Sequence, residues 1–522
     1  MSKTLRGRLL AAIFTSGVLA TFAAQARAET LADAIALAYE TNPTLLAQRS
    51  TQRALDETYV QARAGWRPTI GLSGSATYLQ TRTPRAARSV PIDTNGDGIP
   101  DTLAPASGSG QRESNSGFGG VSFSQPIWTG GRTAAAVSAA ESDVLSGRET
   151  LRRVEAQVMG QVIQAYMDVR RDQEGLRIRN ENVSVLKRQL EESQARFDVG
   201  EITRTDVSQS QARLAASQSL YQSAVAQLAI SRATYAAVVG QNPGQLAPEP
   251  SLAYLLPANA DEAFAVAEKN SPLLRAQQFA EQASRTRIAA ARAERMPTVS
   301  VRAQMGFTGV VEPFDSGRWS RNVQGVATVT VPLFSGGLTS SRIRQQIERN
   351  NTDRINIETQ RRSVLQTITQ TWNQLIANRA NIDSTAEAVR AAQIAAEGTN
   401  QEQRVGLRTT LDVLNAEQEL RNDELSAVAA KHDEYIAAAS VLSAMGRLEA
   451  KNLIPVEPQY DPRSNFRKHR ITLGWVPWEE PIAIVDRAVA LPPIPAAVGK
   501  PVESAIGPGL QPPPASPGAP RK

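Results

Sequence analysis

Few residues of this chain could carry catalytic chemistry. Its 522 residues include no cysteine and only two histidines, His432 and His469, which are far apart in the sequence. Without cysteine, a disulfide framework, a thiolate metal site and a cysteine nucleophile are excluded. His432 stands in a helical pattern between Lys431 and Asp433 and is predicted to lie on a solvated face. No phosphate-binding glycine loop or zinc-ligand spacing is present, so the sequence does not predict an enzyme.

One short segment has the residue types of a calcium loop. In DTNGDGIPD, oxygen-bearing side chains stand at alternate positions and are followed by a glycine, as in an EF-hand loop. The candidate ligands are Asp93, Asn95, Asp97 and Asp101. The twelfth position, where the EF-hand pattern needs a bidentate glutamate, is Ala104. Two interpretations stay open, a calcium site and a polar surface loop without a metal.

Two further acidic residues stand at matching places in the sequence. Asp206 and Asp412 each follow a threonine by three positions, in FDVGEITRTDV and QRVGLRTTLDV. This spacing is that of a capping box, which opens a helix. Gly200 and Gly406 precede the threonines at positions suited to a left-handed helix C-cap. The sequence therefore predicts two turns, each of which joins a pair of antiparallel helices.

Long helices are predicted on both sides of these turns. No proline occurs from Ile127 to Asn242 or from Leu333 to Ile454, and a helix interior is where proline is least tolerated. Apolar residues recur every seven positions in both segments, as in a coiled coil. They are Val162, Val169, Leu176, Val183, Leu190 and Phe197, and then Ile368, Leu375, Ile382, Val389 and Ala396. An unbroken helix over residues 133–197 would extend roughly 100 Å at ~1.5 Å per residue.

The whole chain reads as a duplication. From Pro126 onward the first copy recurs 206 positions later, so that QPIWTGG is matched by VPLFSGG, in which Pro332 corresponds to Pro126. Upstream of Thr69 the offset is 229 positions, and the first copy therefore has 23 additional residues between Thr69 and Pro126. We predict a first repeat over residues 29–250 and a second over residues 251–454.

Each repeat also contains two segments with the alternation of a β-strand. Residues 70–78 and 121–127 alternate apolar with small polar residues, and so do residues 299–307 and 323–333. This pattern suits strands that lie between lipid and a water-filled lumen. Four strands cannot close a barrel, and an open edge would leave backbone groups unsatisfied in hydrocarbon. Several chains must then share one barrel, and on these grounds eight or twelve strands are both possible.

The two ends of the chain differ from the repeated body. Residues 1–28 combine a basic start, an apolar stretch and a small-x-small motif, which predicts a secretory signal peptide. Its removal lowers the formal net charge from +6 to +2, so nucleic-acid binding is not indicated. Residues 455–522 hold 15 of the 30 prolines and are predicted to be largely disordered. The alternative is that Trp475 and Trp478 let the first part of this tail lie against the helices.

Together these features resemble the TolC family of outer-membrane efflux and secretion ducts. The resemblance covers about Glu29 to Leu453 and rests on an NP start, the PIWTGG and PLFSGG segments and the paired VG…DV turns. It implies a mixed α and β membrane protein, a homotrimer with a shared 12-stranded β-barrel in the lipid of the outer membrane and a long coiled-coil tunnel across the periplasm. At each strand-to-helix junction a proline would end strand pairing and two glycines would allow the bend. The junction residues are Pro126, Gly130, Gly131, Pro332, Gly336 and Gly337.

The resemblance also gives the predicted turns a role. In the family they converge at the periplasmic entrance, where polar links close the channel and carboxylates surround it. The matching positions are Asp412, Arg408, Asp206, Thr205, Gln403 and Asn415. Glutamine here replaces a linking tyrosine and asparagine replaces a second carboxylate, which implies one ring of three carboxylates, from Asp412. Arg408 would link to Thr205 and Asp206 of the other hairpin. The alternative is that both aspartates serve only as helix caps.

The implied function is a passive exit duct, which a periplasmic adaptor and an inner-membrane ABC or proton-driven transporter open at the hairpin tips. The absence of a lipid-anchoring cysteine and the TolC-like junctions favour type I protein secretion. Small-molecule or multidrug efflux is the alternative within this class. A non-transporting periplasmic coiled-coil spacer is an alternative from a different class, but a spacer would have no reason to contain four alternating strands.

Overall fold

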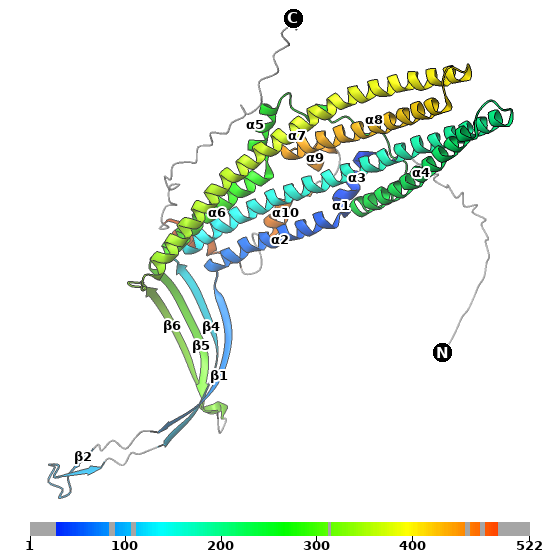
Figure 1. The fold of residues 1–522 in the computed structure, drawn as a ribbon. Coiled ribbons are helices and arrows are strands. Elements are labelled where there is room, and N and C mark those ends of the chain that lie inside the picture. Colours follow the sequence, from blue (N-terminus) through cyan, green and yellow to red (C-terminus); the bar gives the residue numbers. More distant parts are fainter. Residues whose placement is uncertain are drawn as a thin grey trace, which may run out of the picture.

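The computed structural model describes residues 28–82, 89–105, 111–311, 315–454, 460–469 and 475–488. Residues 1–27 of the predicted signal peptide lie outside the described residues, and so does the end of the tail from residue 489 onward. The described chain is elongated, with a layer of antiparallel helices that continues at one end into a four-stranded sheet (Figure 1).

Two long helical hairpins dominate the molecule. Helices α3 (Arg132–Asp198) and α7 (Leu338–Arg404) each contain 67 residues. They return as α4 (Arg204–Val239) and α8 (Thr410–Ala444), and both hairpin tips lie at the end of the molecule away from the sheet (Figure 1). The unbroken helix predicted over residues 133–197 is confirmed, and the equal lengths of the two copies match the constant offset of 206 residues.

Shorter helices pack along the long ones. Helices α2 (Pro43–Arg63) and α6 (Pro272–Ala293) both contact α3, and each begins with a proline, whose missing N–H is not needed in a first helical turn. Helices α1 (Leu31–Thr41), α5 (Ala260–Asn270) and α9 (Ala450–Leu453) are shorter still. Among the described residues, every helix is either too short or too polar to cross a bilayer.

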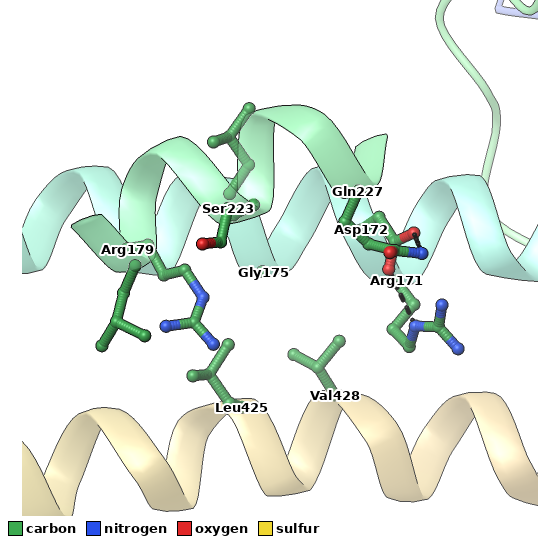
Figure 2. Close-up of a pocket in the computed structure, with 11 residues that line it drawn as sticks. Arg171, Asp172, Gly175, Arg179, Ser223, Gln227, Leu425 and Val428 are labelled. Carbon is green, nitrogen blue, oxygen red and sulfur yellow. Dashed lines mark hydrogen bonds and ion pairs between the residues drawn. The ribbon is translucent and has the colours of Figure 1, made fainter. Parts of the chain in front are cut away.

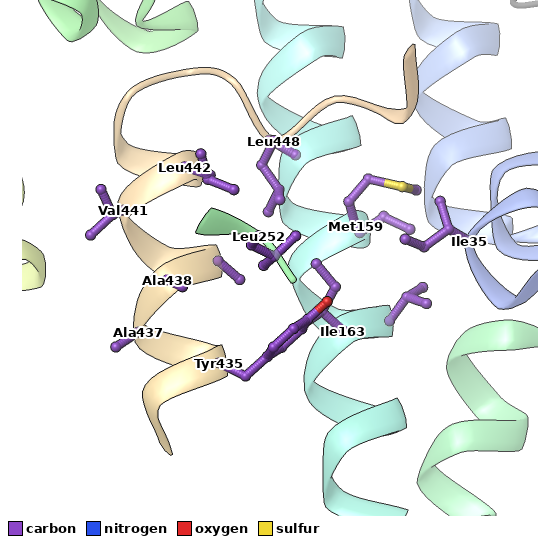
Figure 3. Close-up of a cluster of buried hydrophobic side chains, with 14 of the residues drawn as sticks. Ile35, Met159, Ile163, Leu252, Tyr435, Ala437, Ala438, Val441, Leu442 and Leu448 are labelled. Atoms are coloured by element: carbon purple, nitrogen blue, oxygen red, sulfur yellow. The ribbon is translucent and has the colours of Figure 1, made fainter. Parts of the chain in front are cut away.

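The main buried core lies between α3 and α8, partway along the layer of antiparallel helices. Leu442 on α8 and Ile163 on α3 point toward each other there around Leu252 and Tyr435, whereas Ala437 and Val441 lie on the other side of α8 (Figure 3). This cluster also includes side chains of α1, α4, α5 and α7, so one core fixes both hairpins to the shorter helices.

The sheet is antiparallel and has the order β1-β4-β5-β6. Its strands are β1 (Thr69–Arg82), β4 (Gln111–Trp128), β5 (Thr298–Gly309) and β6 (Ser320–Thr330). All four predicted strands are therefore present, two from each repeat. Within the described chain the outer edges of β1 and β6 have no partner strand, and apolar side chains such as Leu72, 84 % exposed, are uncovered.

The additional length of the first repeat forms a separate ribbon. Strands β2 (Ser89–Ile92) and β3 (Thr102–Pro105) pair with each other beyond the end of the sheet that is far from the helices (Figure 1). The ribbon leaves the pairing of β1 with β4 intact, because the partners run without a break from Thr69 with Ser124 to Arg82 with Gln111.

Two parts of the C-terminal tail pack on the helices. Helix α10 (Pro462–His469) packs on α2, and helix α11 (Glu479–Ala488) packs on α3, on β4 and on the 3-10 turn Ala64–Trp66. Residues 460–469 and 475–488 therefore agree with the interpretation in which the first part of the tail lies against the helices, and the prediction of disorder for the rest of the tail concerns residues outside those described. The proline-rich composition hid a few specific buried contacts of the tail.

His432 is also not where the sequence placed it. Its side chain is buried between α8 and α3, with Nε2 2.9 Å from Oδ1 of Asp168 and Nδ1 2.8 Å from Oδ1 of Asp433. Burial alone would lower the pKa of His432, but hydrogen bonds to the two carboxylates outweigh it and raise that pKa. Arg171 lies close enough to oppose the charge in part. His432 therefore links the first hairpin to the second, and the link is strongest when His432 is protonated.

The His432 contact predicts a pH-dependent stability. Because its pKa is raised in the folded chain, the stabilisation is complete below the unfolded value of about 6.5 and is lost as pH rises through the folded value. We expect His432→Gln to reduce stability at pH 5.5 by roughly 1–3 kcal/mol and to have little effect at pH 9. Thermal unfolding of the detergent-solubilised protein, followed by circular dichroism, measures this. An equal loss at both pH values would contradict a charged His432.

Candidate functional site

The two hairpin tips are built from the same turn chemistry. Gly200 has φ 82° and Gly406 has φ 81°, so both adopt the left-handed conformation that ends a helix. In the second tip, the carboxylate of Asp412 accepts hydrogen bonds from the backbone N–H and the hydroxyl of Thr409, at 3.0 and 2.8 Å. Thr203 and Asp206 form the same capping box in the first tip. Both tips are therefore well-ordered turns of equal design.

The charges of the second tip are grouped on one turn. The guanidinium Nε of Arg408 lies 2.8 Å from Oε2 of Glu402, and this partner, with Asp412 nearby, raises the pKa of Arg408. Hydrogen bonds from the backbone and side chain of Thr409, together with Arg408, lower the pKa of Asp412. Asp412 is half-buried and negatively charged at neutral pH, as a ring carboxylate would have to be.

The link predicted between the hairpins does not form within one chain. Among the described residues, Arg408 makes no hydrogen bond or ion pair with Thr205 or Asp206, because Glu402 of its own turn is nearer. The hairpins are joined instead by Arg213 of α4, whose Nη2 donates to Oδ1 of Asn415 at 2.9 Å. Sequence reasoning missed Arg213, and no motif marks it.

Other tip positions vary in exposure. Gln403, which replaces the family's tyrosine, is buried, whereas Asn415 and Thr205 are exposed. The seam within the first hairpin becomes polar toward the tip. There, Asn182 Nδ2 donates to Ser217 Oγ at 3.1 Å, and the hydroxyls of Ser193 and Ser210 are 3.1 Å apart. The apolar repeat of the sequence is therefore a core near the middle of the molecule and a partly polar contact near the tip.

A cavity of about 340 Å³ lies between the two hairpins. Its walls come from α3 and α4 on one side and from α8 on the other (Figure 2). Gly175 opens space opposite Leu425 and Val428, while Arg171 and Arg179 bring positive charge. The lining combines apolar side chains with polar ones, and Asp172 pairs with Arg171 at 2.9 Å, which suits the side chain of a protein partner.

The DTNGDGIPD segment forms a loop between β2 and β3 that is stabilised without a metal. The carboxylate of Asp93 accepts backbone N–H groups of Asn95, Gly96 and Gly98, at 3.1, 2.7 and 2.6 Å. Asp101 accepts from the backbone and hydroxyl of Thr94. These bonds lower the pKa of both carboxyls. In the described residues no three acidic or histidine side chains converge as metal ligands. Asp93, Asn95, Asp97 and Asp101 therefore lie in a polar loop held by its own hydrogen bonds, and calcium binding there stays a prediction.

The strand-to-helix junctions use left-handed glycines. Gly130 and Gly131 have φ 69° and 84°, and Gly336 and Gly337 have φ 60° and 82°, values that other residues adopt only with strain. Pro126 lies at a bulge, because the pairing of β4 with β5 shifts register between it and Trp128. Pro332 follows Thr330, the last residue of β6, by two positions. Proline thus marks the end of regular pairing at both junctions.

Helix α11 makes the two junctions unequal. The buried carboxylate of Asp486 accepts backbone N–H groups of Thr129, Gly131 and Ala134, at 2.8, 3.0 and 3.2 Å, and the indole N–H of Trp66 at 3.1 Å. The three backbone N–H groups lie at the start of α3, where the helix dipole and the unpaired donors favour an anion. The first junction is therefore capped by the tail of the same chain.

A second buried acid attaches α11 to the end of α2. Glu479, which is 0 % exposed, lies 2.8 Å from Nε of Arg63 and 2.9 Å from Nε of Arg67. Arg63 donates to one carboxylate oxygen of Glu479 and Arg67 donates to the other, so both oxygens of the buried acid are paired with a positive charge. Seven residues separate Glu479 from Asp486, and this spacing puts both acids on one helix face. Together with Trp475 and Trp478, this spacing was the sequence signal of the docked tail.

At the second junction the described residues have no such cover. A side chain at Gly336 would meet nothing within 4 Å, whereas one at Gly130 would meet Cβ of Met296 at 2.5 Å. Leu333 and Phe334 are 92 % and 91 % exposed. The duplicated sequence motif therefore serves two different environments.

The described chain has a four-stranded sheet with two free edges, and the sheet continues into hairpins of 67-residue helices. Because free edges have to pair with other chains in a membrane, these features define the protomer of an oligomeric channel. Residues 34–241 and 265–447 match the family model described as outer membrane efflux protein. The chain belongs to this family. Its TolC-type channels trimerise, the 12-stranded barrel forms only in the trimer, and the helical tunnel lies in the periplasm. The family consists of channels, not enzymes.

Several known proteins are similar over most of the chain. The outer membrane efflux protein BepC of Brucella suis is 32% identical over 89% of this chain and 95% of its own length. TolC of Vibrio cholerae is 24% identical over 85% and 97%. AprF of Pseudomonas aeruginosa, named an alkaline protease secretion protein, is 24% identical over 60% and 66%. The crystal structure of VceC from Vibrio cholerae superposes with TM-score 0.63 at 20% identity, covering 80% of this chain and 96% of VceC.

The contacts of Asp486 predict that one side chain holds α11 in place. Asp486→Ala removes the acceptor for three backbone N–H groups and should weaken docking of α11 by roughly 2–4 kcal/mol. Hydrogen exchange followed by mass spectrometry should show amide protection in residues 479–488 falling about 30- to 800-fold. The matched control is Asp461→Ala, which removes an exposed pair with Arg467 next to α10. Equal protection in both variants would contradict the assigned role.

Proposed function

We propose that this chain is the outer-membrane exit duct of a type I protein secretion system, passive by itself and opened at its hairpin tips by an adaptor and an inner-membrane transporter. Membership of the family supports the coarser function, an outer-membrane efflux channel of tripartite systems. The finer assignment rests on the tips and on the similarity to one secretion protein.

The weak connection between the tips is the observation that carries the proposal. Near the tips, among the described residues, the side-chain hydrogen bond between the hairpins is that from Arg213 to Asn415. An exposed polar pair of this kind contributes about 0–1 kcal/mol. The turns themselves are rigid, because each has a capping box and a left-handed glycine. Binding of a partner could therefore separate the hairpins without unfolding either tip.

The cavity between the hairpins supports engagement by an adaptor. It lies between the α3–α4 hairpin and α8, the same two elements that the Arg213 link joins, and it presents Leu425 and Val428 beside Arg179 (Figure 2). A helical adaptor tip could insert an apolar side chain there and an acidic one against the arginine. Such a contact would bias the spacing of the two hairpins directly.

Two observations support protein cargo. The chain has no cysteine that could carry a lipid anchor, and AprF, similar over 60% of this chain, is named for secretion of a protease. Small-molecule efflux is the second candidate, and the 32% identity to BepC, named an efflux protein, favours it. The periplasmic spacer is not retained, because the four strands form the open-edged sheet of a channel family.

The proposed gate predicts a change in ion selectivity. In the trimer, Asp412 would form a ring of three carboxylates at the entrance. We expect Asp412→Asn to lower cation selectivity and to weaken block by divalent cations about tenfold, since each charge is worth about 1 kcal/mol at 4 Å even in water. Asparagine keeps an oxygen that can accept from Thr409, so the helix cap survives.

Single-channel recording in planar bilayers measures this effect. Asp206→Asn is the matched control, because Asp206 has the same capping box in the other hairpin. Unchanged selectivity and unchanged block in Asp412→Asn would show that Asp412 is a helix cap only. An equal effect of both variants would place the constriction elsewhere.

The cargo is tested by deletion of the gene in its own host. Protein secretion predicts that one or a few proteins disappear from the culture medium, while sensitivity to drugs and detergents stays within about twofold of wild type. Restoration by the wild-type gene is the control. A large rise in drug sensitivity with an unchanged set of secreted proteins would instead establish the efflux candidate.

A further inference from the structure

Helix α11 is docked with its charged face inward. Glu479 and Asp486 are both 0 % exposed, whereas Ile484 on the opposite side is 63 % exposed and Val485 is 50 % exposed. A helix that packs on a protein in water normally turns apolar residues inward and charged residues outward. In α11 two acids take inward positions beside the small buried residue Ala483, and charged residues as well as Ile484 and Val485 are exposed on the other side. Because the acids hold the helix in place, its larger apolar side chains are not needed for docking and remain uncovered within the described chain.

Two tryptophans extend this outer surface. Trp475 and Trp478, just before the helix, are 42 % and 46 % exposed. With Ile484 and Val485 they form what we call the apolar face of α11. The charges beside it are paired within the protein: Glu480 lies 2.8 Å from Nη2 of Arg63, and the guanidinium of Arg487 lies over the ring of Trp66 at 5.3 Å.

The apolar face lies where the barrel meets the periplasm. Trp478 donates its indole N–H to Oε1 of Gln125 at 3.1 Å, and Gln125 lies three residues before the end of β4. The 14 residues of β1 span roughly 46 Å, or about 35 Å across the membrane at a tilt of ~40°. A hydrocarbon band of ~25 Å is shorter, which places the ends of the strands in the headgroup layers.

Helix α11 lies on the side of the first junction that continues the apolar face of the sheet. Gln125, which accepts from Trp478, has the same strand parity as Val121 and Phe123 and therefore shares their face of β4, whereas the serines between them face the other way. In a barrel the apolar face contacts lipid and the polar face lines the lumen, so the contact of α11 is on the lipid side.

We propose that α11 is an interfacial helix that binds phospholipid of the inner leaflet of the outer membrane. Its apolar face inserts about 5–10 Å into the boundary between headgroups and acyl chains, and Glu479 and Asp486 fix the helix to the end of α2 and the start of α3. Tryptophan is the residue enriched at this depth, because its ring is apolar and its N–H is polar.

Lipid fits this surface better than a second copy of the chain. The face continues the lipid-contacting surface of the barrel beyond the last residues of β4, and it is repeated three times around a trimer. The bond of Trp478 to Gln125 also leaves its ring half-exposed beside the strand end, as in an aromatic belt. In addition to its barrel strands, each chain then contacts lipid through α11, which covers the first of its two strand-to-helix junctions.

The absence of native cysteine makes a direct test possible. Ile484→Cys is introduced, and the purified trimer is labelled with the fluorophore NBD and placed in nanodiscs of phosphatidylethanolamine and phosphatidylglycerol. Quenching is measured with lipids that carry a nitroxide near the headgroup and separately with aqueous iodide. Ser208→Cys, exposed near the first tip, is the matched control.

We expect the label at position 484 to be quenched by the nitroxide lipid at least twofold more than the label at position 208, and less by iodide. Val485→Cys should behave like Ile484→Cys. The proposal is overturned if iodide quenches positions 484 and 208 equally. It is also overturned if position 484 is shielded from both quenchers, which would place a second copy of the chain on this face. Labelling follows assembly of the trimer, so loss of folding cannot produce the expected pattern.

Discussion

The free backbone edges of β1 and β6 are the constraint on which the rest of the structure depends. In hydrocarbon, each unpaired N–H or C=O group costs several kcal/mol, so these edges have to pair with those of other chains. Closure of the barrel by three chains brings six hairpins around one axis, and the tunnel follows from that arrangement. The left-handed glycine pairs set the direction in which each hairpin leaves the barrel.

The repeated body could be predicted because its signals are local and periodic. Absence of proline and a seven-residue repeat indicated α3 and α7, alternation indicated the four strands, and Gly200 and Gly406 indicated the tips. Each of these features depends on the backbone preferences of a few neighbouring residues. Each of these features occurs twice, at an offset of 229 positions for the first strand and of 206 positions from Pro126 onward, and the second copy supports the interpretation of the first.

Contacts between distant segments could not be predicted in this way. His432 meets Asp168 across two hairpins, and Asp486 meets Thr129 across most of the chain. Periodicity shows which face of a helix is buried but not which side chain lies opposite. For the same reason the sequence does not give the partner that Arg408 has within this chain, Glu402, six positions away. The composition of the tail, averaged over many prolines, likewise concealed two buried acids.

The equal lengths of α3 and α7 restrict how such a chain can change during evolution. One residue added to α3 alone would move its tip by about 1.5 Å and turn it by about 100° relative to the tip of α7. Insertions and deletions in the tunnel can therefore be inherited only as matched pairs, one in each copy. The β2–β3 ribbon escapes this rule, because it lies beyond the sheet and shares no register with the second copy. Chains of this kind should vary in length mainly at their outer loops.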